Sequence, residues 1–173
     1  MLLNLGIGQG ELLATPVQLA TMTAVVANKG RAVRPHVVQS IQGQGSFKLE
    51  KPVEPGVNTD RANWDTVHLA MHKVTLPGGT ANQSRSVPGM DVAGKTGTAQ
   101  NPHGKDHALF VCFAPLESPT MALAIVNENV GHGSDFAVPI AGALFKRLFS
   151  PDSTGAAARA RALEVPPDTT GAD

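Results

Sequence analysis

The stretch Gly89-Met-Asp-Val-Ala-Gly-Lys-Thr-Gly-Thr-Ala-Gln100 decides how the fold of this 173-residue chain is interpreted. Two interpretations compete. Gly89 together with the Gly-Lys-Thr triplet at 94–96 matches G-x-x-x-x-G-K-[ST], a loop that binds phosphate between a strand and a helix. The same residues also suit a β-strand, with Lys95 and Gly97 on one face and Thr96 and Thr98 on the other.

The residues on either side of this stretch favour the strand. Pro88 ends any strand before Gly89, and Gly97, Asn101-Pro102 and Gly104 leave no room for a helix after the triplet. No other predicted strand ends in an Asp that would bind magnesium. The match of Gly89–Thr96 to a P-loop NTPase therefore stays the less favoured alternative.

Three apolar runs after Asp91 predict strands, at 92–99, 109–114 and 121–127. The connections between them are a handful of residues each, whereas a parallel crossover needs about a dozen or more, so we expect an antiparallel meander. The second and third runs are apolar almost throughout, which indicates that helices cover both faces of the sheet. The fold class is therefore α+β, an antiparallel sheet flanked by helices.

Three helices are expected around this sheet. The first begins at Thr15, with Pro16 and a T-x-x-Q capping box, and ends at Asn28-Lys-Gly30. Apolar residues surround it on most sides, so we place it in a core. The second begins near Thr59 and is broken at 76–79. The third runs from about Phe136 to Phe149, with Asp135 as its cap, and Pro139 fits only in its first turn.

Weaker signals lie elsewhere in the chain. Two short strands are expected at 35–41 and 47–50, and residues 6–10 read as a glycine-rich loop. Residues 151–173 have little to bury, which predicts a disordered tail, with a transient helix over 156–165. Residues 1–150 form the structured part.

Composition excludes several classes of function. Fourteen basic and fourteen acidic residues cancel, and only 4% of the residues are aromatic, so neither a net field nor stacking platforms favour nucleic acid. The single cysteine excludes an internal disulfide. No apolar run reaches the ~20 residues of a membrane span, and no basic-then-apolar leader is present.

Two histidine patterns have spacings that could suit a metal site. His68 and His72 lie four apart on a predicted helix, but Leu69 stands where a zinc protease has Glu and no third ligand is evident. His103, His107 and Cys112 are explained better by a turn, a strand entrance and a core position. We expect neither a metal nor another cofactor.

A set of short motifs resembles class B penicillin-binding proteins, in the family's order. Within that family the elongation type, penicillin-binding protein 2, is most similar, and the resemblance covers about residues 4–149. The combination is more specific than any one motif. The segments are Gly8-Gln-Gly10, Ala14-Thr-Pro-Val-Gln-Leu-Ala20, Ala27-Asn-Lys-Gly30, Gly79-Thr-Ala81, Ala93-Gly-Lys-Thr-Gly-Thr-Ala-Gln100, Phe113-Ala-Pro115 and Val126-Asn-Glu-Asn129.

The resemblance implies a partial β-lactamase/transpeptidase-like (penicillin-recognising) fold and a serine-type D,D-transpeptidase activity. In that family a serine of S-x-x-K attacks the D-Ala-D-Ala end of a peptidoglycan stem peptide, and an amine then accepts the acyl group; β-lactams acylate the same serine. By this pattern Lys95, Thr96, Gly97 and Thr98 bind the substrate. Lys95 also supplies charge near the serine, and the Thr98 backbone N–H is an oxyanion donor.

The family's nucleophile is missing from this sequence. No lysine has a serine three residues earlier, and no Ser-x-Asn occurs; Thr80-Ala-Asn82 has only its outline. We therefore expect residues 1–150 to be the C-terminal half of a transpeptidase domain that is inactive alone. The missing N-terminal half of the domain is then a partner.

The resemblance also implies where the parent protein works. It places the domain on the outer, periplasmic face of the inner membrane, beside a glycosyltransferase partner. A non-catalytic scaffold that binds a cell-wall synthesis partner is the alternative.

Overall fold

The computed structural model describes residues 13–38, 56–85 and 87–150. The expected loop at 6–10, the strand at 47–50 and the tail at 151–173 lie outside these ranges. Residues 35–38, the described part of the expected strand 35–41, form no strand. In chain order the elements are α2 (Pro16–Ala27), α3 (Arg61–Thr75), the 3-10 helix η1 (Asn82–Ser84), β1 (Ala93–Ala99), β2 (His107–Ala114), β3 (Met121–Asn127) and α4 (Gly133–Phe149).

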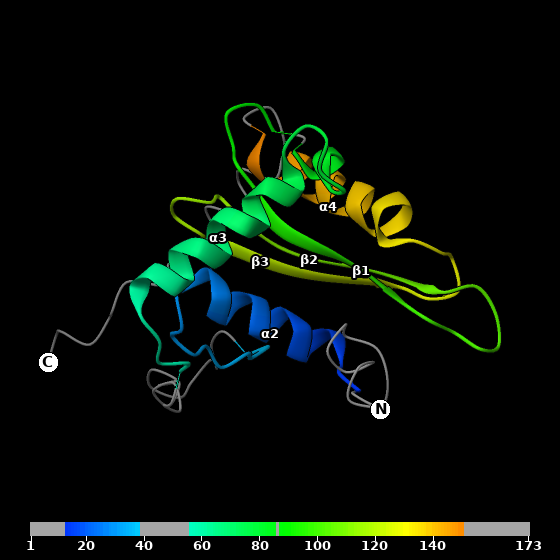
Figure 1. Ribbon diagram of the computed structural model, residues 1–173, viewed down its shortest axis with the longest axis horizontal. Coiled ribbons are helices and arrows are strands. Elements are labelled where there is room, and N and C mark those ends of the chain that lie inside the picture. Colours follow the sequence, from blue (N-terminus) through cyan, green and yellow to red (C-terminus); the bar gives the residue numbers. More distant parts are fainter. Residues whose placement is uncertain (1–12, 39–55, 86, 151–173) are drawn as a thin grey trace, which may run out of the picture.

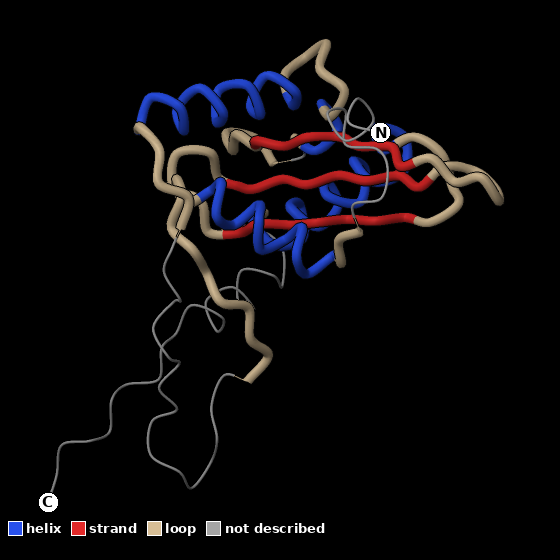
Figure 2. Tube along the Cα trace, turned by 60° about the horizontal axis from the view of Figure 1, so that its bottom comes forward, coloured by secondary structure: helices blue, strands red, loops and turns tan. Residues whose placement is uncertain are grey.

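The three strands form the predicted antiparallel meander. β2 pairs with β1 along one side and with β3 along the other, so the order in space is β1-β2-β3. Figure 2 shows the strands side by side, with helices on both sides of them. The turns at 100–106 and 115–120 are too short for a crossover, which is why each strand reverses direction.

The two faces of β2 belong to different parts of the core. Phe110 and Cys112 point toward α4, where Val138 and Phe145 are also fully buried. Phe113 points the other way, toward Ala27 at the end of α2. Helices α2 and α4 thus cover opposite faces of the sheet, as Figure 1 shows, and the prediction of a sheet covered on both faces is confirmed.

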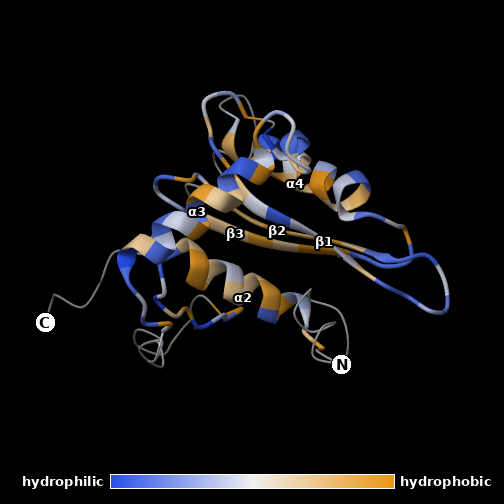
Figure 3. Cartoon of the chain, in the orientation of Figure 1, coloured by the Kyte–Doolittle hydropathy of each residue, from blue (hydrophilic) through white to orange (hydrophobic). Residues whose placement is uncertain are grey.

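Helix α2 begins as the sequence predicts. Thr15 is its N-cap, and the reciprocal hydrogen bonds of a capping box join Thr15 and Gln18. The expectation that this helix is buried is wrong for its outer side, because Val17 is 59% and Met22 is 51% exposed. Figure 3 shows hydrophobic residues over much of α2. One side of the helix packs on the sheet and the other faces solvent.

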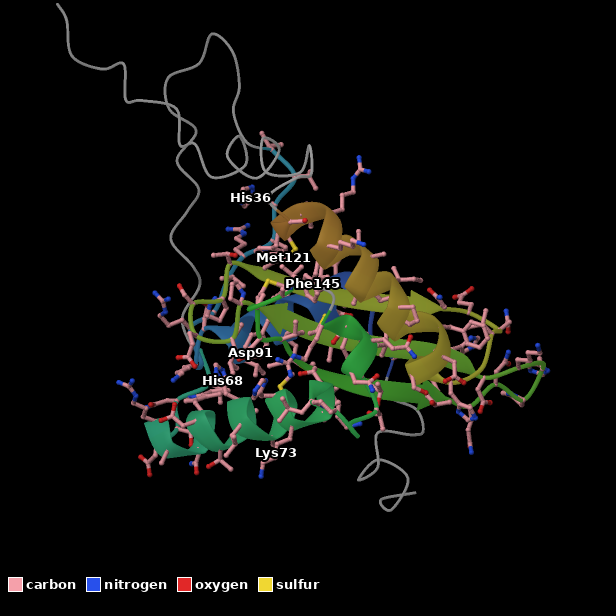
Figure 4. The ribbon with its side chains drawn as sticks, turned by 90° about the horizontal axis from the view of Figure 1, so that it is seen from above. His36, His68, Lys73, Asp91, Met121 and Phe145 are labelled. Carbon is pink, nitrogen blue, oxygen red and sulfur yellow. The ribbon has the colours of Figure 1, made fainter. Side chains whose placement is uncertain are left out.

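Helix α3 lies against the start of β1 and the end of α2. The Thr75 hydroxyl and the His72 Nδ1 both hydrogen bond to the Val92 carbonyl oxygen, at 2.6 and 3.1 Å. His68 Nε2 hydrogen bonds to the Val26 carbonyl oxygen at 2.8 Å, and its ring lies 4.9 Å from that of Phe113. Figure 4 shows His68 on the inner side of α3, with Lys73 turned outward.

A surface ion pair adds to the contact between α2 and α3. Lys29 Nζ lies 2.6 Å from Asp65 Oδ1. This hydrogen bond lowers the pKa of the Asp65 carboxyl below its ordinary value. The pair is solvent-exposed, so it contributes little to stability.

Helix α4 starts at Gly133, three residues before the predicted start. His132 is its N-cap, and Asp135 lies in the first turn and accepts a hydrogen bond from the Ser134 hydroxyl, so the expected Asp135 cap is wrong. Pro139 therefore lies inside the helix. The ring removes a backbone hydrogen bond, and the burial of the inner face, including Phe145, offsets that loss.

Candidate functional site

Strand β1 presents the Lys95–Thr98 segment along an edge of the sheet. Thr96 is paired with Phe110 and Thr98 with Ala108, and both β2 residues belong to the core beneath α4. Directly opposed residues of an antiparallel pair point to the same face. The two threonines therefore lie on the α4 side and Lys95 on the α2 side, which agrees with the strand interpretation.

The edge of β1 is open in the described part of the chain, where β2 is its only strand neighbour. The Lys95 ammonium reaches round this edge and donates to the Thr96 carbonyl oxygen at 2.6 Å. The Thr96 carbonyl therefore points away from β2. Backbone orientation alternates along an antiparallel strand, so the N–H of Thr98, two residues on, points to the same edge.

A groove of about 370 Å³ opens at this edge, between β1 and the first turn of α4. Its lining includes Lys95 and three threonines, and no acidic residue. An anion therefore fits its chemistry better than a cation does. The lining residues are Thr80, Lys95, Thr96, Gly97, Thr98, His132, Gly133 and Ser134.

Glycine at position 133 brings α4 directly onto the strands. A Cβ there would lie 2.3 Å from the Leu109 carbonyl oxygen and 2.5 Å from the Gly97 carbonyl oxygen, distances that real side chains do not adopt. Gly97 is also close to β2, since a Cβ on it would lie 3.3 Å from the Leu109 Cβ. The shape of the groove therefore depends on these two glycines.

Thr80 is the groove residue that the sequence analysis missed as a site residue. It lies in the turn between α3 and η1, and its hydroxyl oxygen is 3.0 Å from that of Thr96. The sequence contained only the Gly79-Thr-Ala81 motif, sixteen residues before Thr96, and no periodicity links the two positions. His132 and Ser134 were likewise read only as part of a loop.

The histidines and the cysteine of the two candidate metal sites have structural roles instead. His68 and His72 hydrogen bond to backbone carbonyl oxygens, and His107 Nδ1 accepts from the Asn129 backbone N–H at 3.1 Å. Burial raises the pKa of the Cys112 thiol well above its ordinary value, which disfavours the thiolate that a metal needs. Among the described residues no group of three or more His, Cys, Asp or Glu side chains is placed to hold a metal ion.

The phosphate-loop alternative is wrong for this chain. Gly94, Lys95 and Thr96 lie inside β1, and the next element is the antiparallel strand β2. A phosphate-binding loop needs a helix N-terminus at that point, directed at the phosphates. Within the described residues, 13–38, 56–85 and 87–150, no helix begins at that point.

Residues 2–150 match the sequence pattern of the transpeptidase family, described as the penicillin binding protein transpeptidase domain. The chain belongs to this transpeptidase domain family. The match includes every described helix and strand, and the resemblance inferred from the motifs is confirmed.

Curated relatives of this transpeptidase domain are named peptidoglycan D,D-transpeptidases. The chain is 34% identical over 157 residues to the peptidoglycan D,D-transpeptidase MrdA of Haemophilus influenzae, which covers 80% of the chain and 24% of the relative. It is 36% identical over 151 residues to MrdA of Acinetobacter baumannii, covering 78% of the chain and 22% of the relative. The chain thus spans about a quarter of the length of these relatives.

Solved structures agree with the fold of the transpeptidase domain. Pseudomonas aeruginosa PBP2, in complex with WCK 5153, superposes with a TM-score of 0.73 at 42% identity, covering 86% of this chain and 32% of that one. Penicillin-binding protein A of Mycobacterium tuberculosis, solved as an imipenem acyl-enzyme complex, gives 0.65 at 28%, covering 83% and 32%. PBP2 of Helicobacter pylori in complex with MreC gives 0.61 at 27%, covering 83% and 27%.

Proposed function

We propose that this chain supplies the substrate-binding strand of a peptidoglycan D,D-transpeptidase. The observation that carries the proposal is the groove at the open edge of β1. Its lining includes Lys95, Thr96 and Thr98, residues that carry one ammonium and two hydroxyls. The backbone N–H of Thr98 points to the same edge, by the alternation of the strand. Such a set of donors suits a peptide that ends in a carboxylate.

In the proposed complex the D-Ala-D-Ala end of a stem peptide lies along β1. The hydroxyls of Thr96 and Thr98 donate to its terminal carboxylate, and Lys95 adds positive charge to the same groove. Gly97 has no side chain, so the peptide backbone can approach the strand closely. β-Lactams carry a comparable carboxylate beside a reactive carbonyl, and they would bind in the same place.

The reaction is acyl transfer through a serine ester. The serine oxygen bonds to the carbonyl carbon between the two D-alanines, the C–N bond breaks, and the terminal D-alanine leaves with a proton. An amine of a neighbouring stem peptide then attacks the ester and releases the serine. The Thr98 N–H would stabilise the oxyanion in both steps, and one such donor contributes about 3–4 kcal/mol.

The serine and its lysine are proposed to come from another part of the parent protein. The present sequence contains neither S-x-x-K nor Ser-x-Asn. Residues 1–150 would then be one portion of the catalytic domain, and 151–173 a tail beyond it. No helix in the described ranges is long and apolar enough to cross a bilayer.

The relatives support a proposal for the partners and placement of the parent. We propose that it works on the outer, periplasmic face of the inner membrane and binds β-lactams, as the M. tuberculosis relative binds imipenem. A protein partner is expected too, since the H. pylori relative is solved with MreC. A glycosyltransferase that makes the glycan strands would act beside it.

Replacing Lys95 in the parent protein tests the proposal. Lys95→Ala should slow acylation by a fluorescent penicillin at least tenfold, because the groove loses its cation. Lys73→Ala is the matched control, since Lys73 is an exposed lysine of α3 outside the groove. Equal acylation rates for the two variants, or a parent with no serine-containing motif, would favour the scaffold alternative.

A further inference from the structure

Within the groove, the hydroxyl of Thr96 contacts the hydroxyl of Thr80. The two hydroxyl oxygens lie 3.0 Å apart, a hydrogen-bond distance at which either can donate. The family pattern assigns no role to Thr80. Its hydroxyl nevertheless lines the same groove as Lys95 and Thr98.

The turn that carries Thr80 is held on both sides. A Cβ on Gly79 would lie 2.2 Å from the Val74 carbonyl oxygen, so only glycine allows the chain to pass so close to the end of α3. On the other side, the N–H of Ala81 donates to that same Val74 oxygen at 2.9 Å, and Ala81 is fully buried. Thr80 is therefore fixed between two anchored residues.

Thr96 is held just as firmly, on a different element. It lies in the middle of β1, which pairs with β2 over seven residues. The hydroxyl of Thr75, at the end of α3, donates to the Val92 carbonyl oxygen just before β1. The distance between the Thr80 and Thr96 hydroxyls is thus set by the packing of α3 against β1, and not by a mobile side chain alone.

A hydroxyl has one proton, so the direction of this hydrogen bond matters. If Thr96 donates to Thr80, its lone pairs face the groove and repel a carboxylate. If Thr80 donates to Thr96, the Thr96 proton is free to point into the groove. Successive hydrogen bonds in one direction also strengthen each other.

We propose that Thr80 is a positioning residue for carboxylate recognition. Its hydroxyl donates to Thr96, and Thr96 then donates to the carboxylate of the stem peptide or β-lactam. This inference rests on the proposed function, because it requires a carboxylate ligand in the groove.

The test uses the parent protein, benzylpenicillin and the methyl ester of benzylpenicillin, with acylation rates measured for each variant. Thr80→Val keeps the shape and removes the hydroxyl, and it should slow acylation by benzylpenicillin about three- to tenfold. Thr80→Ser should restore the rate. The ester has no carboxylate, so Thr80→Val should leave its rate unchanged. Thr66→Val, an exposed threonine of α3, is the matched control.

The variants also separate this inference from the proposed function. In a Thr96→Val background, Thr80→Val should add less than a twofold effect, because Thr80 acts through Thr96. A normal rate for Thr80→Val together with a slow Thr96→Val would overturn the role of Thr80 alone. If Thr80→Val slowed acylation by benzylpenicillin and by its ester equally, or if Thr80→Ser did not restore the rate, Thr80 would have only a structural role. A parent that is not acylated at all, or is indifferent to Thr96→Val, would overturn both proposals.

Discussion

Cys112 carries the only thiol of the chain and lies in the second half of β2, under α4. It is fully buried, and this burial raises the pKa of its thiol because the thiolate loses its hydration. A hydrophobic role explains the residue without any redox or catalytic chemistry.

Burial should also make this thiol slow to react. In the folded chain at pH 8, Cys112 should react with a thiol reagent at least a hundredfold more slowly than in denaturant. Because its pKa is raised by folding, the stability that it contributes is present below the ordinary value of 9.0 and is lost as the pH rises above it. The labelling rate is measured by the absorbance of the reagent. Rapid labelling of the native chain would contradict the placement of Cys112 in the core.

The placement of Lys95–Thr98 on a strand is confirmed, because its signal is local. Lys95, Thr96, Gly97 and Thr98 are consecutive, so their alternation along a strand followed from the sequence. Thr80 was out of reach, because its approach to Thr96 depends on how α3 ends and how it packs on β1.

At the scale of elements, hydrophobic pattern located all three strands to within two residues. It located the start of α4 less well, since Gly131-His-Gly133 reads as a loop and Pro139 discourages an early start. The helix nevertheless starts at Gly133 and includes Pro139, because the buried positions on its inner face pack on β2. Tertiary burial here overrides a local penalty of about 3 kcal/mol for proline.

Two phenylalanines on α4 test this explanation. Phe145 is fully buried beside Met121, as Figure 4 shows, whereas Phe136 on the same helix is 43% exposed. Phe145→Ala should lower the free energy of unfolding by about 3–5 kcal/mol, measured in urea. Phe136→Ala is the matched control and should cost much less. Equal losses would mean that the inner face does not hold α4 in place.

At the scale of the whole molecule, the two sides of the sheet differ in what covers them. Helix α4 buries a continuous core, but α2 leaves apolar side chains in solvent, including Val17 at 59% exposure. The sequence predicts burial of α2 because apolar residues lie on most of its sides. It contains no signal for what would cover the outer side of this helix.

Exposed apolar side chains on α2 predict that the chain alone self-associates. Its weight-average mass in sedimentation should rise with concentration. Val17→Lys with Met22→Lys should reduce this rise, whereas Thr66→Lys on α3, an exposed polar position, should not. A monomer at all concentrations, with a sharp reversible melt, would contradict the prediction.

The central claim is that this chain forms the binding wall of a transpeptidase site whose serine lies elsewhere in the parent. Intact-mass measurement after incubation with penicillin, followed by peptide mapping, tests it most directly. The parent should gain one penicillin, on a peptide outside residues 1–173, and the chain alone should gain none. A stoichiometric adduct on the isolated chain, or on any of its own serines, would contradict the claim.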